Sequence, residues 1–81
     1  MEIRLICYAV LQEIISDEPI WLEIPEGCTA NRVIELLSQN YPQARQILKS
    51  TRLANQDSYV EKSSVLEDGE EYCLIPPVSG G

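Results

Sequence analysis

A single amphipathic helical segment between short strand-like stretches most constrains what this chain can fold into. Thr29 is a suitable N-cap residue, and the helix that it opens is predicted to run to about Gln39. Apolar residues recur along it at helical spacing, and these are Ala30, Val33, Ile34, Leu36 and Leu37. The 81 residues have room for one small domain. We therefore expect this helix to bury its apolar stripe against a sheet formed by the other segments.

The segments on both sides of the helix alternate in the manner of strands. Branched and aromatic residues from Ile3 to Tyr8 predict the first strand, and residues 71–75 predict the last. Poorer strand patterns occur at 20–24, 52–55 and 58–60, and short helical stretches are predicted at 10–14 and 42–48. The apolar first and last strands are expected at the centre of a mixed sheet. The order predicts an α+β fold of the β-grasp arrangement.

Strand parity predicts apolar residues on the sheet face that points away from the helix. With Ile3, Leu5 and Cys7 toward the helix, the opposite face receives Ile6, Tyr8, Cys73 and Ile75, together with Tyr59. A face open to solvent is expected to be polar, and exposed apolar patches usually mark an interface. The alternative is that these strands are buried on both faces.

Composition excludes several classes of function. Thirteen acidic residues against six basic ones give a net charge of −7, which argues against nucleic acid and anionic membranes as partners and favours basic proteins. The chain has no histidine, so Ser-His and Cys-His catalysis and His-ligated metals are excluded. No apolar run approaches the roughly 20 residues of a membrane span, and no signal peptide is evident. We expect a cytoplasmic protein without a permanently bound metal or cofactor.

The remaining polar and sulfur-bearing residues are given structural roles. Cys7, Cys28 and Cys73 form no C-x-x-C pair, and free thiols fit a reducing compartment. The position of Cys28 beside a helix start would lower its pKa, although no base or resolving partner is evident. The acidic residues at 67–71 indicate a solvated turn rather than a metal site, and Trp21 is expected to be a packing or surface residue.

The C-terminus carries the most informative motif, which reads Pro76-Pro77-Val78-Ser79-Gly80-Gly81. The two prolines hold the backbone extended, and six residues can reach about 20 Å when stretched. Glycines without a Cβ can enter a narrow tunnel where side chains would collide. The sequence therefore predicts a β-grasp domain over residues 1–75 and an extended tail over 76–81.

The reactive group of such a tail is the α-carboxylate of Gly81. A carboxylate is a poor electrophile until a partner that uses ATP converts it to an acyl-adenylate. The activated carbonyl can then accept sulfur as a thiocarboxylate or a lysine as an amide. Docking of the domain at a distance from Gly81 would supply the binding energy that holds the tail in place.

This ending, preceded by Leu66-Glu67-Asp68-Gly69-Glu70-Glu71, resembles the small, sulfur-carrier subunits of molybdopterin synthase. Asn55-Gln56 followed by Tyr59-Val60, and the first strand ending in Tyr8-Ala9, are also similar to that family. The likeness spans essentially the whole chain, and the Pro-Pro-Val-Ser-Gly-Gly ending is its specific part. The resemblance implies a ubiquitin-like β-grasp fold and a thiocarboxylate at Gly81.

The resemblance also implies the partners and the roles of the site residues. An adenylyltransferase related to ubiquitin-activating enzymes would consume ATP and magnesium, and Gly81 would donate sulfur to cyclic pyranopterin monophosphate in the large synthase subunit. Two small and two large subunits would form a heterotetramer, in which this chain is a carrier rather than an enzyme by itself. Residues implied to contact the partner are Tyr8, Tyr59, Ile75, Pro76, Pro77, Val78 and Ser79, while Gly80 gives the tail access.

Three other functions remain open from the sequence. Thiamine-type sulfur carriers end similarly in Gly-Gly but generally lack the Pro-Pro-Val-Ser approach. A ubiquitin-like modifier would be joined to lysines of target proteins through Gly81. A plain interaction domain would carry its terminal glycines incidentally.

Overall fold

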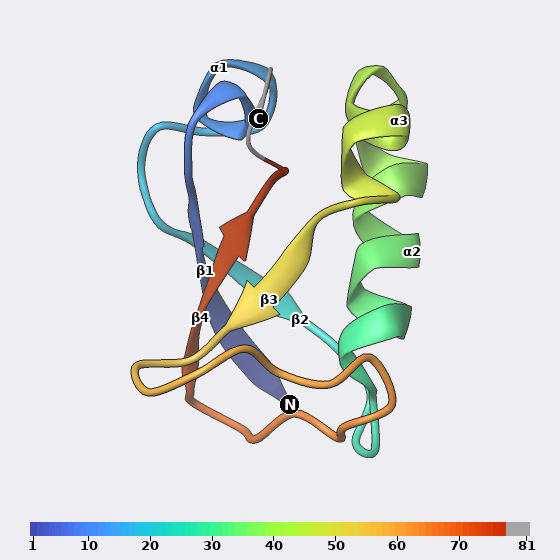
Figure 1. Cartoon of the computed structure of the whole chain (residues 1–81). Helices are drawn as coiled ribbons and strands as arrows, with labels where there is room; N and C mark the ends of the chain where they lie inside the picture. The colour runs from blue at the N-terminus through green and yellow to red at the C-terminus, as the bar shows by residue number, and fades with distance from the viewer. Residues whose placement is uncertain (78–81) are drawn as a thin grey trace.

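Four strands form one mixed sheet in the part of the chain that the computed structural model describes, residues 1–77 (Figure 1). The strands are β1 (Glu2–Cys7), β2 (Ile20–Glu23), β3 (Arg52–Ala54) and β4 (Glu71–Ile75). Their order across the sheet is β2-β1-β4-β3, with β1 and β4 parallel and both edge pairings antiparallel. The first and last strands are central, which confirms the prediction.

Helix α2 (Ala30–Asn40) covers one face of this sheet, and the short helices η1 (Pro42–Ala44) and α3 (Arg45–Leu48) follow it (Figure 1). Thr29 caps α2, because its hydroxyl oxygen accepts a hydrogen bond of 3.2 Å from the backbone N–H of Arg32. Pro42 begins η1, where the N–H that proline lacks has no helical partner to lose.

The core lies between α2 and the sheet. Its largest fully buried side chains are those of Ile3, Leu5, Leu11, Val33, Leu37, Leu48, Leu53 and Leu74. Each such burial contributes on the order of 2 kcal/mol from the apolar surface removed from water. Helix α1 (Val10–Ile14), predicted from the sequence, closes one end of this core with Leu11. No helix within residues 1–77 has the length and apolar character needed to cross a membrane.

The turn from β1 into α1 passes through a conformation that L-amino acids rarely adopt. Ala9 has φ 53° and ψ −133°, and it is the only non-glycine residue with positive φ within residues 1–77. The carbonyl oxygens of Tyr8 and Ala9 accept hydrogen bonds from the N–H groups of Leu11 and Gln12, at 3.1 and 3.0 Å. These bonds begin α1 and hold the turn, at a conformational cost on the order of 1–3 kcal/mol.

Several element boundaries differ from the sequence prediction by one residue, and two predicted segments differ more. β1 ends at Cys7, one residue early, because the turn through Ala9 begins at Tyr8. The predicted helix 42–48 divides into η1 and α3. The predicted strand at 58–60 is reduced to one bridge between Ala54 and Tyr59, where a tight turn leaves room for few pairs.

Candidate functional site

The apolar residues predicted on the outer sheet face lie there together. We call Ile6, Tyr8, Tyr59, Cys73 and Ile75 the tail-end patch. Tyr8 is 44% exposed and Tyr59 53%, while the other members are half-buried. The neighbouring β4 residues Tyr72 and Leu74 are buried on the helix side, which confirms the predicted parity. The alternative of strands buried on both faces is wrong.

The sheet register explains how residues distant in sequence meet in this patch. Ile6 lies beside Cys73 across the parallel β1–β4 pair, and Cys73 lies opposite Ala54 of β3. Ala54 is bridged in turn to Tyr59. These pairings place Ile6, Cys73 and Tyr59 in one row across the sheet. Tyr8 joins the row from beyond the end of β1, where the thiol of Cys73 donates a weak hydrogen bond of 3.7 Å to its hydroxyl oxygen.

The surroundings of Tyr8 keep its phenol neutral. The hydrogen bond with Cys73, the charge of its thiolate, desolvation and the charge of Glu71 all raise the pKa of Tyr8 above its ordinary value. A neutral phenol at the edge of an apolar patch offers a ring surface and a hydroxyl to a docking protein, a combination common in interface anchors.

An arginine borders the patch, and the sequence analysis did not identify it. Arg52 lies opposite Ile75, and its guanidinium lies over the ring of Tyr59, 4.3 Å from the ring centroid. This cation–π contact holds the exposed Tyr59 ring beside the sheet. The pairing depends on the turn that brings Tyr59 back beside β3, so spacing along the sequence gave no signal for it.

The other half of the same face is charged. We call Glu2, Arg4, Trp21, Glu23 and Glu71 the far-end patch. Arg4 lies between Trp21 and Glu71, with its guanidinium carbon 6.0 Å from the Trp21 ring centroid and its Nε 3.6 Å from a carboxylate oxygen of Glu71. Trp21 is a surface residue, as predicted, and is 56% exposed. Apart from Trp21, the apolar side chains of this face therefore lie in the half from which the tail departs.

The base of the tail adjoins the tail-end patch. β4 points toward the end of the molecule that carries α1 (Figure 1). After Ile75, Pro76 is buried and Pro77 is exposed. The predicted tail residues Val78, Ser79, Gly80 and Gly81 lie outside the described residues.

The cysteines are not arranged as reactive centres. Burial raises the pKa of the Cys28 thiol, although the positive charge of Arg32 opposes the shift. The expectation that a helix start would lower this pKa is therefore wrong, because desolvation outweighs the nearby charge. Burial likewise raises the pKa of Cys7. Within residues 1–77, no three His, Cys, Asp or Glu side chains gather as metal ligands would.

Comparison with known sequences gives consistent matches along the chain. The sequence model of the ThiS family matches residues 6–81. The molybdopterin synthase sulfur carrier subunit of Arabidopsis thaliana is 26% identical over 81 residues, covering 100% of this chain and 84% of that protein. The subunit of the same name from Dictyostelium discoideum is 28% identical over 83 residues, covering 99% of this chain and 96% of that one.

Solved structures share the fold. SAMP1 from Haloferax volcanii superposes with a TM-score of 0.80 at 17% identity, with both chains fully covered. A ubiquitin from Caldiarchaeum subterraneum gives 0.67 at 18% identity, covering 100% of this chain and 98% of that one. A chain in the complex of subunits 1 and 2 of molybdopterin-converting factor from Helicobacter pylori gives 0.68 at 20% identity, with both chains fully covered. The predicted ubiquitin-like β-grasp fold is confirmed.

Proposed function

This chain belongs to the ThiS family, and we propose that it is the sulfur-carrier subunit of a molybdopterin synthase. Full-length relatives carry that name, and a chain of the same fold occurs in a complex of two molybdopterin-converting factor subunits. The observation that carries the proposal is the position of the tail-end patch, an exposed apolar surface on the strand that leads into the Gly-Gly tail. The same strand, β4, thus contributes to the docking surface and leads into the tail that ends in the Gly81 carboxylate.

The proposed loading step takes place on the Gly81 carboxylate. A carboxylate oxygen attacks the α-phosphorus of ATP in an activating adenylyltransferase, and pyrophosphate leaves. Sulfide (HS−) from a sulfur donor then attacks the acyl carbon, AMP leaves, and the chain ends in a thiocarboxylate. ATP and magnesium belong to the activating partner in this scheme, and the chain itself supplies only the unhindered terminus.

The proposed delivery step takes place in the large synthase subunit. The thiocarboxylate sulfur forms a bond to a carbon of cyclic pyranopterin monophosphate as a carbon–oxygen bond of that carbon breaks and the oxygen leaves. Water then hydrolyses the resulting acyl–sulfur bond. Sulfur stays on the product, and the carboxylate of Gly81 returns for another cycle. The chain's contribution to the rate is positioning, because docking at a remote surface converts the reaction of a flexible tail into one within a complex.

In this proposal, different residues dock the domain on the partner and direct the tail. Tyr8, Tyr59 and Ile75 present side chains to the partner from the tail-end patch. The buried Pro76 anchors the start of the tail on the domain, and Pro77 restricts the backbone that follows. In the sequence Val78 and Ser79 precede Gly80 and Gly81, whose missing side chains would allow entry to a narrow active site.

The test of loading is mass spectrometry of the intact chain after incubation with the activating enzyme, ATP, magnesium and a sulfur donor. The full chain is expected to gain about 16 Da, because one oxygen is exchanged for sulfur at Gly81. A variant extended by one alanine after Gly81 should keep its fold and its unmodified mass. An unchanged full chain, or equal loading of the extended variant, would contradict the proposal.

A further inference from the structure

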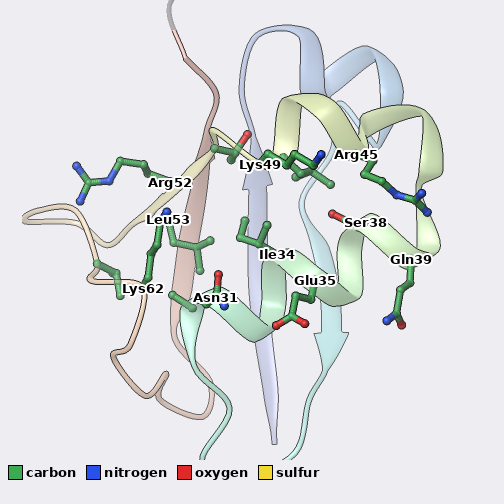
Figure 2. A pocket seen from close by; sticks show the side chains of 14 residues that line it. Asn31, Ile34, Glu35, Ser38, Gln39, Arg45, Lys49, Arg52, Leu53 and Lys62 are labelled. Atoms are coloured by element: carbon green, nitrogen blue, oxygen red, sulfur yellow. The ribbon is translucent and has the colours of Figure 1, made fainter.

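A groove with a basic rim lies on the helix side of the molecule, away from the tail-end patch. It runs between α2, α3, β3 and the segment around Val60 and Lys62, with a volume of about 450 Å³ (Figure 2). This volume is within the range of surface clefts that hold small ligands or short peptide segments. The proposed function assigns no role to this groove.

The middle of the groove is apolar. Leu48 and Leu53 form its buried floor, at 0% and 2% exposure, and Ile34 and Val60 line it while half-buried. Figure 2 shows Ile34 and Leu53 between the cations of the two ends. Aliphatic side chains of an occupant would be removed from water against this floor.

The two ends of the groove are basic. Arg45 of α3 and Lys49, which directly follows α3, stand at one end, and Lys62 stands at the other (Figure 2). Within residues 1–77 none of these three cations is in a salt bridge. The one acidic lining residue, Glu35, is 3.6 Å from Arg32. Arg52 also lines the groove, but its guanidinium lies over Tyr59.

This distribution is unusual for a chain with thirteen acidic and six basic residues. Apart from Arg52, three of the six basic residues line the groove, against one of the thirteen acidic residues. The rest of the chain would repel an acidic partner, so the groove is the surface where such a partner gains attraction. An apolar middle between basic ends fits a segment that is apolar in its middle and acidic at its ends.

We infer that this groove binds a short extended segment of a partner protein, with about four aliphatic residues between acidic ends. The length follows from α2, because Asn31 to Gln39 spans about 12 Å at 1.5 Å per residue, which is the reach of about four extended residues. The half-buried Ile34 and Val60 favour a peptide over a simple anion, since an anion would leave the apolar middle unused.

The two binding surfaces lie on opposite sides of the sheet. The tail-end patch lies on its outer face, and α2 and α3 cover the other (Figure 1). A partner segment in the groove therefore leaves the outer face open to another protein. The inference does not depend on the tail chemistry, and a test with peptides alone separates its failure from failure of the proposed function.

The experiment is an amide NMR titration of the full chain with a blocked octapeptide, Asp-Glu-Leu-Val-Ile-Leu-Glu-Asp. We expect a dissociation constant on the order of 0.1 mM, with shifts concentrated at the groove and little change at Ile6 or Cys73. Two control peptides replace the acidic residues by Asn and Gln, or the aliphatic residues by Ser, and both should bind at least about fivefold more weakly.

Variants that reverse one positive charge test the groove against a matched position outside it. Lys49→Glu and Lys62→Glu, one at each end of the groove, should each weaken binding about tenfold. Arg4→Glu makes the same change of charge on the outer face and should change binding less than about twofold. The spectrum of each free variant reports whether its fold is intact.

Four results of the titrations would overturn the inference, and a fifth concerns the free chain. These are no shifts at the groove at millimolar peptide, equal binding of the Asn and Gln peptide, and equal weakening by Arg4→Glu. The fourth is a response of the groove amides to inorganic phosphate but not to the acidic peptide, which would make this a site for small anions. Shifts that depend on protein concentration without peptide would instead assign the groove to a second copy of the chain, and would also overturn it.

Discussion

The two ends of the outer sheet face belong to the same strands and carry opposite kinds of side chain. Along β1 the outward residues run Glu2, Arg4, Ile6, and along β4 they run Glu71, Cys73, Ile75. Both central strands therefore change from charged to apolar in the direction of the chain. Since β1 and β4 are parallel, their charged residues lie at one end of the face and their apolar residues lie together at the other.

The parallel pairing of β1 and β4 explains why the tail-end patch forms at the base of the tail. In an antiparallel pair the same two sequences would place charge beside apolar residues at both ends of the face. Parallel pairing collects the apolar residues at the end where β4 leaves the sheet, and the charged ones at the other. The proposed docking surface and the exit of the tail therefore lie at the same end of the sheet, and the two ends should respond differently to substitution.

The largest expected difference concerns binding to the large subunit. Ile75→Asp places a charge in the tail-end patch, where docking would remove it from water, and should weaken binding at least about 100-fold, or roughly 2.7 kcal/mol. Calorimetric titration of the large subunit measures this loss. The thermal unfolding of the variant should stay close to that of the unsubstituted chain, because Ile75 is only half-buried.

The control for this comparison is Trp21→Ala at the far-end patch. Trp21 is the larger and more exposed side chain, at 56%, so a purely hydrophobic account of docking would predict a greater loss from its removal. We expect less than about a threefold change, because Trp21 lies outside the tail-end patch. Equal losses for the two variants would refute the division of the face.

The next difference concerns the turns at the two ends. At the far end Gly69 takes φ 81°, and at the tail end Ala9 takes φ 53°. Ala9→Gly should raise the free energy of unfolding by about 1 kcal/mol, since the relief of strain exceeds the added freedom of the unfolded chain. Urea unfolding at neutral pH measures the change.

The reciprocal variant is Gly69→Ala, expected to lower the free energy of unfolding by about 1 kcal/mol. A Cβ added at Gly69 would have no atom within 4 Å, so the cost is conformational and not a clash. Opposite signs for the two variants are the expected pattern. A destabilised Ala9→Gly protein would show that the Ala9 turn is not strained.

The smallest expected effect is the pH dependence of stability that comes from the two buried cysteines. Burial raises the pKa values of Cys7 and Cys28 above the ordinary 9.0. The unfolded thiols therefore lose protons first as pH rises, and the free energy of unfolding should fall above about pH 9. Below that pH both states keep their protons and no dependence arises from these groups.

Urea unfolding under reducing conditions at pH 7 and pH 10 measures this slope. The double variant Cys7→Ala, Cys28→Ala should have a flatter dependence over that range, whatever its stability at pH 7. A slope unchanged by the two substitutions would assign the alkaline loss to other groups, such as Tyr8, whose pKa is also raised.

Much of the fold could be predicted because local signals agreed with one another. The N-cap at Thr29, the helical stripe of α2 and the alternation of β1 and β4 all require the same packing. Parity alone placed Ile6 and Cys73 on the outer face before the register was known. The family resemblance rested on the terminal motif, which lies outside the packed domain.

Other features depend on relations that a sequence does not show. The positive φ of Ala9 could not be predicted, because glycine is the residue that usually indicates positive φ and this position is an alanine. The contact of Arg52 with Tyr59 depends on the turn after β3 that brings Tyr59 back beside this strand, and the sequence did not show where that turn would place Tyr59. The basic groove joins α3 to a distant loop, although the spacing of Arg45 and Lys49 by four residues would have placed them on one helix face.

The most direct test of the central claim follows the sulfur itself. Chain loaded with the thiocarboxylate is mixed with the large subunit and cyclic pyranopterin monophosphate, and the mass of the intact chain is followed with product formation. We predict that the chain loses about 16 Da in step with product, as sulfur leaves and the Gly81 carboxylate returns. Product formed while the chain keeps its sulfur, or a chain consumed into amide-linked conjugates with lysines, would contradict this account.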